Sequence, residues 1–194
     1  FGQLRDVAIY TIGFTIGSII EIPYNALTRI TDSKISDALH RTDMEMVRTV
    51  YIKSTKILML IGGFLLVAVI INVKSLLTFL PDKYAESIIV VIIISTSSFI
   101  NMSTGINNSL IFYSEKYIYG SLLLFGLIAL SVILNFLLIP VYGIMGAAIA
   151  TSTATLLYNS IKSYMIWRWY KIQTFGVYVF YSSLLLVLCF TINY

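Results

Sequence analysis

Apolar residues along the chain gather into six long runs, and short polar connectors separate these runs. The runs cover about residues 7–30, 56–73, 85–113, 119–139, 144–167 and 175–194. Because a helix rises ~1.5 Å per residue, ~20 apolar residues cross the ~30 Å hydrocarbon layer of a bilayer. The pattern therefore predicts an all-α fold, a polytopic membrane helix bundle of about six transmembrane helices.

The first run, residues 7–30, carries polar side chains at membrane depth. A carboxylate there is costly, so we expect Glu21 to face protein or a water-filled cavity. We interpret it as a cation-binding, proton-exchanging or headgroup-contacting group. The alternatives are a contact that locks two helices together, or a position shallow enough in the membrane to be hydrated. Pro23 is expected to free a backbone carbonyl as a further ligand, or else to kink the helix. The residues that recur every four positions on one helix face are Gly13, Gly17, Glu21, Asn25 and Arg29.

The third run, residues 85–113, starts apolar and becomes polar. Ser97, Asn101, Thr104 and Asn108 follow the spacing i, i+4, i+7, i+11, which places them on one stripe of a helix. Asparagine offers both donors and acceptors, as sugar hydroxyls require. Hydrogen bonds between helices, worth ~0.6 kcal/mol each in membranes, are the alternative. We predict that this stripe, with Glu21 and Asn25, lines a transport cavity.

The connectors predict the orientation of the chain. Residues 31–49 form a polar stretch that can be an amphipathic helix at the membrane surface, with Ile35, Leu39 and Met46 touching it. If the six spans cross the membrane in alternating directions, one side of the membrane holds ten basic residues and the other side holds three. Basic residues concentrate on the cytoplasmic side, so residues 31–49 are expected there. The ten are Arg29, Lys34, Arg41, Arg48, Lys53, Lys56, Lys116, Lys162, Arg168 and Lys171, and the three are Arg5, Lys74 and Lys83.

Composition supports a membrane protein and explains the basic balance. Hydrophobic residues make up 58% and charged residues 11% of the chain, and its mean hydropathy is +0.89. Soluble domains have ~45–50% and ~25%. The net charge of +4 follows from the connectors rather than from a basic patch, so no nucleic-acid partner is expected.

Signatures of enzymatic chemistry are missing from the sequence. There is no GxxxxGK[ST] motif, and the single His40 has no histidine or cysteine near it in the chain. The one cysteine, Cys189, lies in an apolar run. We therefore expect no catalytic residue, no metal site and no cofactor, and the protein is not expected to be an enzyme.

A longer passage carries a resemblance. Residues 135–170 read NFLLIPVYGIMGAAIATSTATLLYNSIKSYMIWRWY. This passage resembles the second half of bacterial polysaccharide (O-antigen type) flippases of the multidrug/oligosaccharidyl-lipid/polysaccharide exporter superfamily. The pattern IPxxGxxGAAxAT carries the likeness, and IPYNAL at residues 22–27 and FYSEKYIYG after the third run fit it too. The matching residues are Ile139, Pro140, Gly143, Gly146, Ala147, Ala148, Ala150 and Thr151.

The resemblance implies that residues 1–194 are a fragment, most of the C-terminal lobe of a two-lobe flippase in the bacterial inner membrane. Its partners would be the missing N-terminal lobe, membrane lipids and a lipid-linked oligosaccharide. Alternating access would move that lipid across the membrane for surface polysaccharide or lipopolysaccharide biosynthesis, with sodium or a proton as the coupling ion. Such flippases carry a cationic cavity, and the runs hold almost no basic residue. Either the missing lobe supplies the charge, or Arg5 and Arg29 reach headgroups by snorkelling.

Two other functions stay open. The first is a cation-coupled multidrug exporter of the same superfamily, which needs an aromatic, acid-lined pocket. The second is a non-transporting membrane scaffold, which predicts no water-accessible polar stripe.

Overall fold

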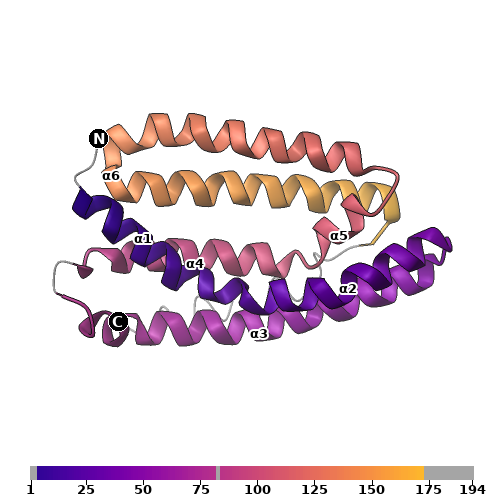
Figure 1. Ribbon diagram of the computed structural model, residues 1–194, viewed down its shortest axis with the longest axis horizontal. Coiled ribbons are helices and arrows are strands. Elements are labelled where there is room, and N and C mark those ends of the chain that lie inside the picture. The colour runs from indigo at the N-terminus through magenta and orange to yellow at the C-terminus, as the bar shows by residue number, and fades with distance from the viewer. Residues whose placement is uncertain (1–3, 82–83, 173–194) are drawn as a thin grey trace.

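The computed structural model describes residues 4–81 and 84–172, and these contain helices and no β-strand (Figure 1). The predicted all-α class is confirmed. The predicted run 175–194 lies outside the described residues. In chain order the elements are α1 (Leu4–Ser18), the 3-10 helix η1 (Ile19–Glu21), α2 (Ile22–His40), α3 (Met44–Thr78), α4 (Ser87–Ser103), α5 (Asn107–Phe112) and α6 (Tyr117–Tyr170).

Helix α4 is the centre of the bundle, where it packs against α1, α3 and α6 (Figure 1). Its contact with α1 is close because α1 presents glycines there. A Cβ on Gly13 would lie 2.7 Å from Val90, and one on Gly17 would lie 2.8 Å from Ile94. Small residues at such a contact let two backbones approach closely, which is how helices associate in membranes.

The first run is helical throughout but changes phase at η1. Pro23 has no N–H to bond the carbonyl of Ile19, and that carbonyl accepts from the N–H of Ile22 instead. The expected free carbonyl is therefore satisfied within a 3-10 turn. Because a 3-10 helix has three residues per turn, the inward face passes from Glu21 to Tyr24 rather than to Asn25. Tyr24 is buried, whereas Asn25 and Arg29 are exposed.

The polar stretch 31–49 is not a separate surface helix. It is the end of α2, a tight connector and the start of α3, and Asp43 caps α3 by accepting from the N–H of Met46 over 2.9 Å. Ile35, expected at the membrane surface, is fully buried in the core with Val47. Leu39 is half-buried and Met46 is exposed.

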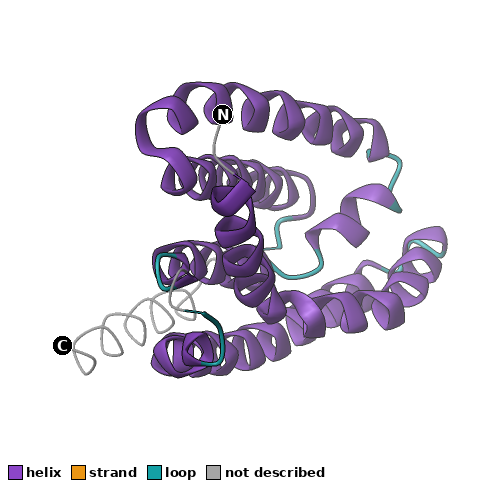
Figure 2. Cartoon of the chain, turned by 60° about the vertical axis from the view of Figure 1, so that its left-hand side comes forward, coloured by secondary structure: helices purple, strands orange, loops and turns teal. Residues whose placement is uncertain are grey.

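The third run, expected as one segment, is broken into α4 and α5. Helix α4 ends at Ser103, and Gly105 adopts a φ of +71°, a left-handed conformation that glycine tolerates best. A Cβ at this position would overlap the hydroxyl of Thr55 on α3. Helix α5 then leaves α4 toward α6 (Figure 2).

Helix α6 is a hairpin of two antiparallel arms (Figure 1). The turn falls at Gly143, whose φ is +56°, and a Cβ on Gly146 would overlap the carbonyl of Leu138. The arms cover about residues 117–142 and 144–170, so each is about 40 Å long. These bounds contain the predicted runs 119–139 and 144–167.

The long helices suit a membrane. Among the residues that the structure describes, three helical stretches are long and apolar enough to cross one, namely Arg5–His40, Met44–Thr78 and Tyr117–Tyr170. The α2–α3 and α5–α6 connectors and the end of α6 lie at one end of the bundle. The α3–α4 connector and the turn of α6 lie at the other (Figure 1).

Candidate functional site

Two chains of hydrogen-bonded side chains cross the interior of the bundle, and their members form what we name the polar cluster. In the first chain, Nδ2 of Asn159 on α6 donates to Oδ1 of Asn101 on α4 over 2.9 Å. Nδ2 of Asn101 then donates to Oε1 of Glu21 over 3.2 Å. Asn159 is fully buried and its Oδ1 has no partner, whereas Asn101 and Glu21 are half-buried. The first chain therefore ends in a carboxylate on one side and an open acceptor on the other.

The second chain holds a lysine. Nζ of Lys162 on α6 donates to Oδ1 of Asn108 on α5 over 2.8 Å, and Nδ2 of Asn108 donates to the hydroxyl of Tyr24 over 3.3 Å. The same Nζ lies 4.1 Å from the ring centroid of Tyr158, a cation–π contact. The polar cluster is Glu21, Tyr24, Asn101, Asn108, Tyr158, Asn159 and Lys162.

Four members of the polar cluster, Tyr24, Tyr158, Asn159 and Lys162, were not in the predicted cavity set, and the charged one is Lys162. It was counted among the cytoplasmic basic residues, yet only 2% of it is exposed. It precedes Lys171 by nine residues, or ~13 Å along the helix. No carboxylate of the described residues forms an ion pair with it, and Glu21 acts on it only from a longer range. The spacing of the sequence could have indicated this position, because Lys162 follows Tyr158 by four residues and Asn159 by three, on one helical face.

The break between α4 and α5 is itself satisfied by polar side chains. The hydroxyl of Tyr51 on α3 bonds Oδ1 of Asn107, and the Thr104 carbonyl also lies 3.3 Å from it. Nδ2 of Asn107 donates to Ser163 of α6 over 3.1 Å. Tyr51 and Asn107 are fully buried. This matters because an unpaired backbone group inside a bundle costs several kcal/mol in hydrocarbon.

The structure brings together only part of the predicted cavity set. Glu21, Asn101 and Asn108 belong to the polar cluster. Thr104 is buried and its hydroxyl donates back to the carbonyl of Asn101 over 2.7 Å. Ser97 is buried on α4, and Asn25 is exposed on α2 outside the cluster.

The two arginines expected at headgroups lie elsewhere. Arg5 forms an exposed ion pair with Glu86 over 2.8 Å at the start of α4. Arg29 is exposed on α2. Neither side chain belongs to the polar cluster, so the positive charge inside the described bundle comes from Lys162.

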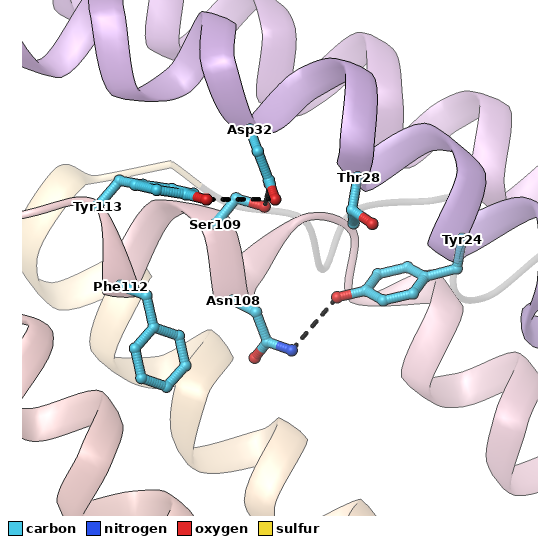
Figure 3. A pocket seen from close by; sticks show the side chains of 7 residues that line it. All are labelled: Tyr24, Thr28, Asp32, Asn108, Ser109, Phe112 and Tyr113. Atoms are coloured by element: carbon cyan, nitrogen blue, oxygen red, sulfur yellow. Dashed lines mark hydrogen bonds between the residues drawn. The ribbon is translucent and has the colours of Figure 1, made fainter.

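A pocket of about 240 Å³ adjoins the second chain between α2 and α5 (Figure 3). Asp32 lies at its rim, where its carboxylate accepts from the hydroxyl of Ser109 and, over 3.5 Å, from that of Tyr113. Asn108 belongs both to the pocket and to the polar cluster. The lining residues are Tyr24, Thr28, Asp32, Asn108, Ser109, Phe112 and Tyr113.

The fold and this site define an all-α protein whose apolar helices are long enough for a membrane and enclose hydrogen-bonding and charged side chains. Within residues 4–81 and 84–172, no three acidic, histidine or cysteine side chains gather to hold a metal ion. No family model, curated protein or solved structure matches the chain.

Proposed function

We propose that the chain is part of a transporter that flips a lipid-linked oligosaccharide across a bacterial inner membrane by alternating access, without enzymatic chemistry. One observation supports this proposal above the others. Apolar helices hold a carboxylate, three amides and a lysine between them, and one of the amides, Asn108, lines a pocket. Ionisable groups at membrane depth are costly, and they mark substrate or ion pathways.

The roles follow from charge. Lipid carriers present phosphate, and Lys162 supplies the positive charge that such a headgroup needs, held ready by Asn108 and the Tyr158 ring. Glu21 carries the opposite charge and belongs to the other hydrogen-bonded chain, in which it accepts from Asn101. We assign Glu21 to coupling with sodium or a proton, which would weaken its bond to Asn101 when it is neutralised.

The cluster supports transport better than simple helix locking because three of its members are not fully buried. Glu21, Asn101 and Asn108 are each half-buried. Asn159 keeps an unpaired acceptor, which a pure packing contact would satisfy. Hydrogen bonds that only lock helices are expected to use up the donors and acceptors that they bury.

The test is the export of surface polysaccharide by the full-length protein that carries Glu21→Gln or Asn101→Leu. Both changes are expected to reduce export. Matched controls are Glu45→Gln and Asn72→Leu, which alter exposed residues outside the cluster. Wild-type export from both site variants would remove Glu21 and Asn101 from the mechanism.

A second function, cation-coupled drug export, is favoured by one observation. The pocket has a carboxylate, Asp32, beside the aromatic rings of Tyr24, Phe112 and Tyr113, as a site for cationic drugs requires. Under this function, a strain that lacks the protein becomes sensitive to lipophilic cations while its surface polysaccharide stays intact. Flipping predicts the reverse.

A further inference from the structure

We propose that the pocket between α2 and α5 is a subsite for a single sugar ring, the ring that is joined to the phosphate of the carried lipid. This inference rests on the proposed flipping function, which names a glycan but assigns no place to any of its rings. Asp32, Phe112 and Tyr113 line the pocket but are not members of the polar cluster, and the subsite gives these three residues a function. Figure 3 shows their side chains around one space with Asn108 and Tyr24.

The size of the pocket restricts the ligand. Its volume is about 240 Å³, the room of about eight waters at ~30 Å³ each. Sites for drug-sized molecules start at ~300 Å³. The pocket therefore has room for one ring with its hydroxyls, and because it is open on one side, the rest of a longer glycan would lie outside it.

The polar groups at the rim have bonding capacity left for hydroxyls. A carboxylate offers about four acceptor positions, and the Asp32 carboxylate uses two of them for Ser109 and Tyr113. The hydroxyl of Tyr24 accepts from Asn108, so its own hydrogen can be donated. A neutral ring that carries several hydroxyls matches both an acceptor and a donor in one place.

The walls supply the apolar half of sugar recognition. Tyr24, Phe112 and Tyr113 bring three aromatic rings to the pocket, and Phe112 and Tyr113 are 38% and 45% exposed. The face of an aromatic ring is negative, so it attracts the C–H groups of a sugar ring. A gap between two helices that holds only water would not need three aromatic rings beside hydrogen-bonding groups.

The location joins the pocket to the charge assigned to the phosphate. Asn108 lines the pocket, and its Oδ1 accepts from Lys162. A glycosyl phosphate can therefore put its ring beside Asp32 and its phosphate toward Lys162, on either side of Asn108. This arrangement makes the first sugar and its phosphate the recognised unit.

The test is saturation-transfer NMR on the full-length protein in phosphatidylcholine nanodiscs, which carry no sugar detergent. The probes are the methyl pyranosides of glucose, galactose, mannose and N-acetylglucosamine, and tetramethylammonium serves as a cationic probe. At least one glycoside is expected to show transfer to its ring C–H groups. Asp32→Asn and Phe112→Ala are each expected to weaken its binding about tenfold or more, because the first removes a charged acceptor and the second removes an aromatic wall.

Matched controls are Asp37→Asn, an exposed acid on the same helix, and Phe125→Ala, an exposed phenylalanine on α6. Both are expected to bind as the wild type does, and thermal unfolding shows that every variant is folded. No transfer to any glycoside overturns the subsite, as does transfer to tetramethylammonium alone or equal loss in the controls.

A vesicle assay with a fluorescent lipid-linked glycan separates this inference from the function that it rests on. Flipping by a wild-type protein that binds no glycoside would overturn the subsite and leave the proposed function standing. Glycoside binding without any flipping would overturn the function and leave a sugar pocket.

Discussion

Lys162 and Asn108 lie 54 positions apart in the chain and are joined by a 2.8 Å hydrogen bond from Nζ to Oδ1. This contact exists because α4 ends at Ser103 and α5 sets off toward α6. The break in the helix and the buried lysine are thus two halves of one arrangement.

Replacing the lysine separates stability from function. Lys162→Met keeps the length and apolar stem and removes the charge. Because a buried charge is costly to desolvate, its loss is expected to change the free energy of unfolding by no more than ~2 kcal/mol, even though Asn108 loses a donor. Flipping of an anionic lipid-linked glycan is expected to fall about tenfold or more.

The measurements are an SDS titration in mixed micelles and a vesicle flipping assay. Lys53→Met, which alters an exposed lysine on α3, is the control and should leave both unchanged. Normal flipping by folded Lys162→Met would show that the lysine serves packing alone.

Tyr51 stabilises the break between α4 and α5. Tyr51→Phe removes the hydroxyl that bonds Asn107 and lies beside the Thr104 carbonyl, and it leaves these acceptors buried. We expect a loss of ~1–3 kcal/mol in the free energy of unfolding. The control is Tyr164→Phe on an exposed part of α6. Equal stability of the two variants in an SDS titration would mean that the break is held by other contacts.

Gly105 is required by backbone conformation and by space together. Gly105→Ala places a Cβ at a φ of +71° and against the Thr55 hydroxyl, so we expect a loss of ~1–3 kcal/mol or more. Gly126→Ala meets nothing within 4 Å and should change stability by less than ~1 kcal/mol. Combining Gly105→Ala with Thr55→Ala should restore part of the loss, which an unfolding titration would measure. No rescue would assign the whole cost to the backbone.

The periodicity of the sequence predicted the helices well and their internal breaks poorly. Apolar runs predict membrane helices because the free energy of placing a segment in a membrane depends on its composition and length alone. The four-residue repeat correctly put Gly13, Gly17 and Glu21 on the face toward α4, and it failed at Asn25 because a 3-10 turn shifts the phase by a fraction of a residue.

The candidate site was predictable where its members share one helix. Ser97 and Asn101 lie on α4 and Thr104 follows its last residue, as the stripe required, but Asn108 reaches the cluster only through the break at Gly105. The burial of Lys162 could not be predicted, because a lysine near the end of a predicted membrane helix is expected to be solvent-exposed on the cytoplasmic side. Only the partners on α5 and the Tyr158 ring show that it is buried.

Water access distinguishes a transporter from a scaffold, and two positions of the predicted stripe now differ. Asn108 lines the pocket and is half-buried, whereas Ser97 is 7% exposed inside the bundle. In a protein whose Cys189 has been replaced by serine, Asn108→Cys should react with a membrane-impermeant thiol reagent, and Ser97→Cys should react much more slowly. Thr42→Cys in the α2–α3 connector gives the rate of an exposed site.

A lipid-linked glycan should protect Asn108→Cys and leave Thr42→Cys unaffected, because only the first position borders the sugar and phosphate sites. An Asn108→Cys thiol as unreactive as that of Ser97→Cys would favour the scaffold, since a dry cluster can hold helices together but offers no path to a polar lipid.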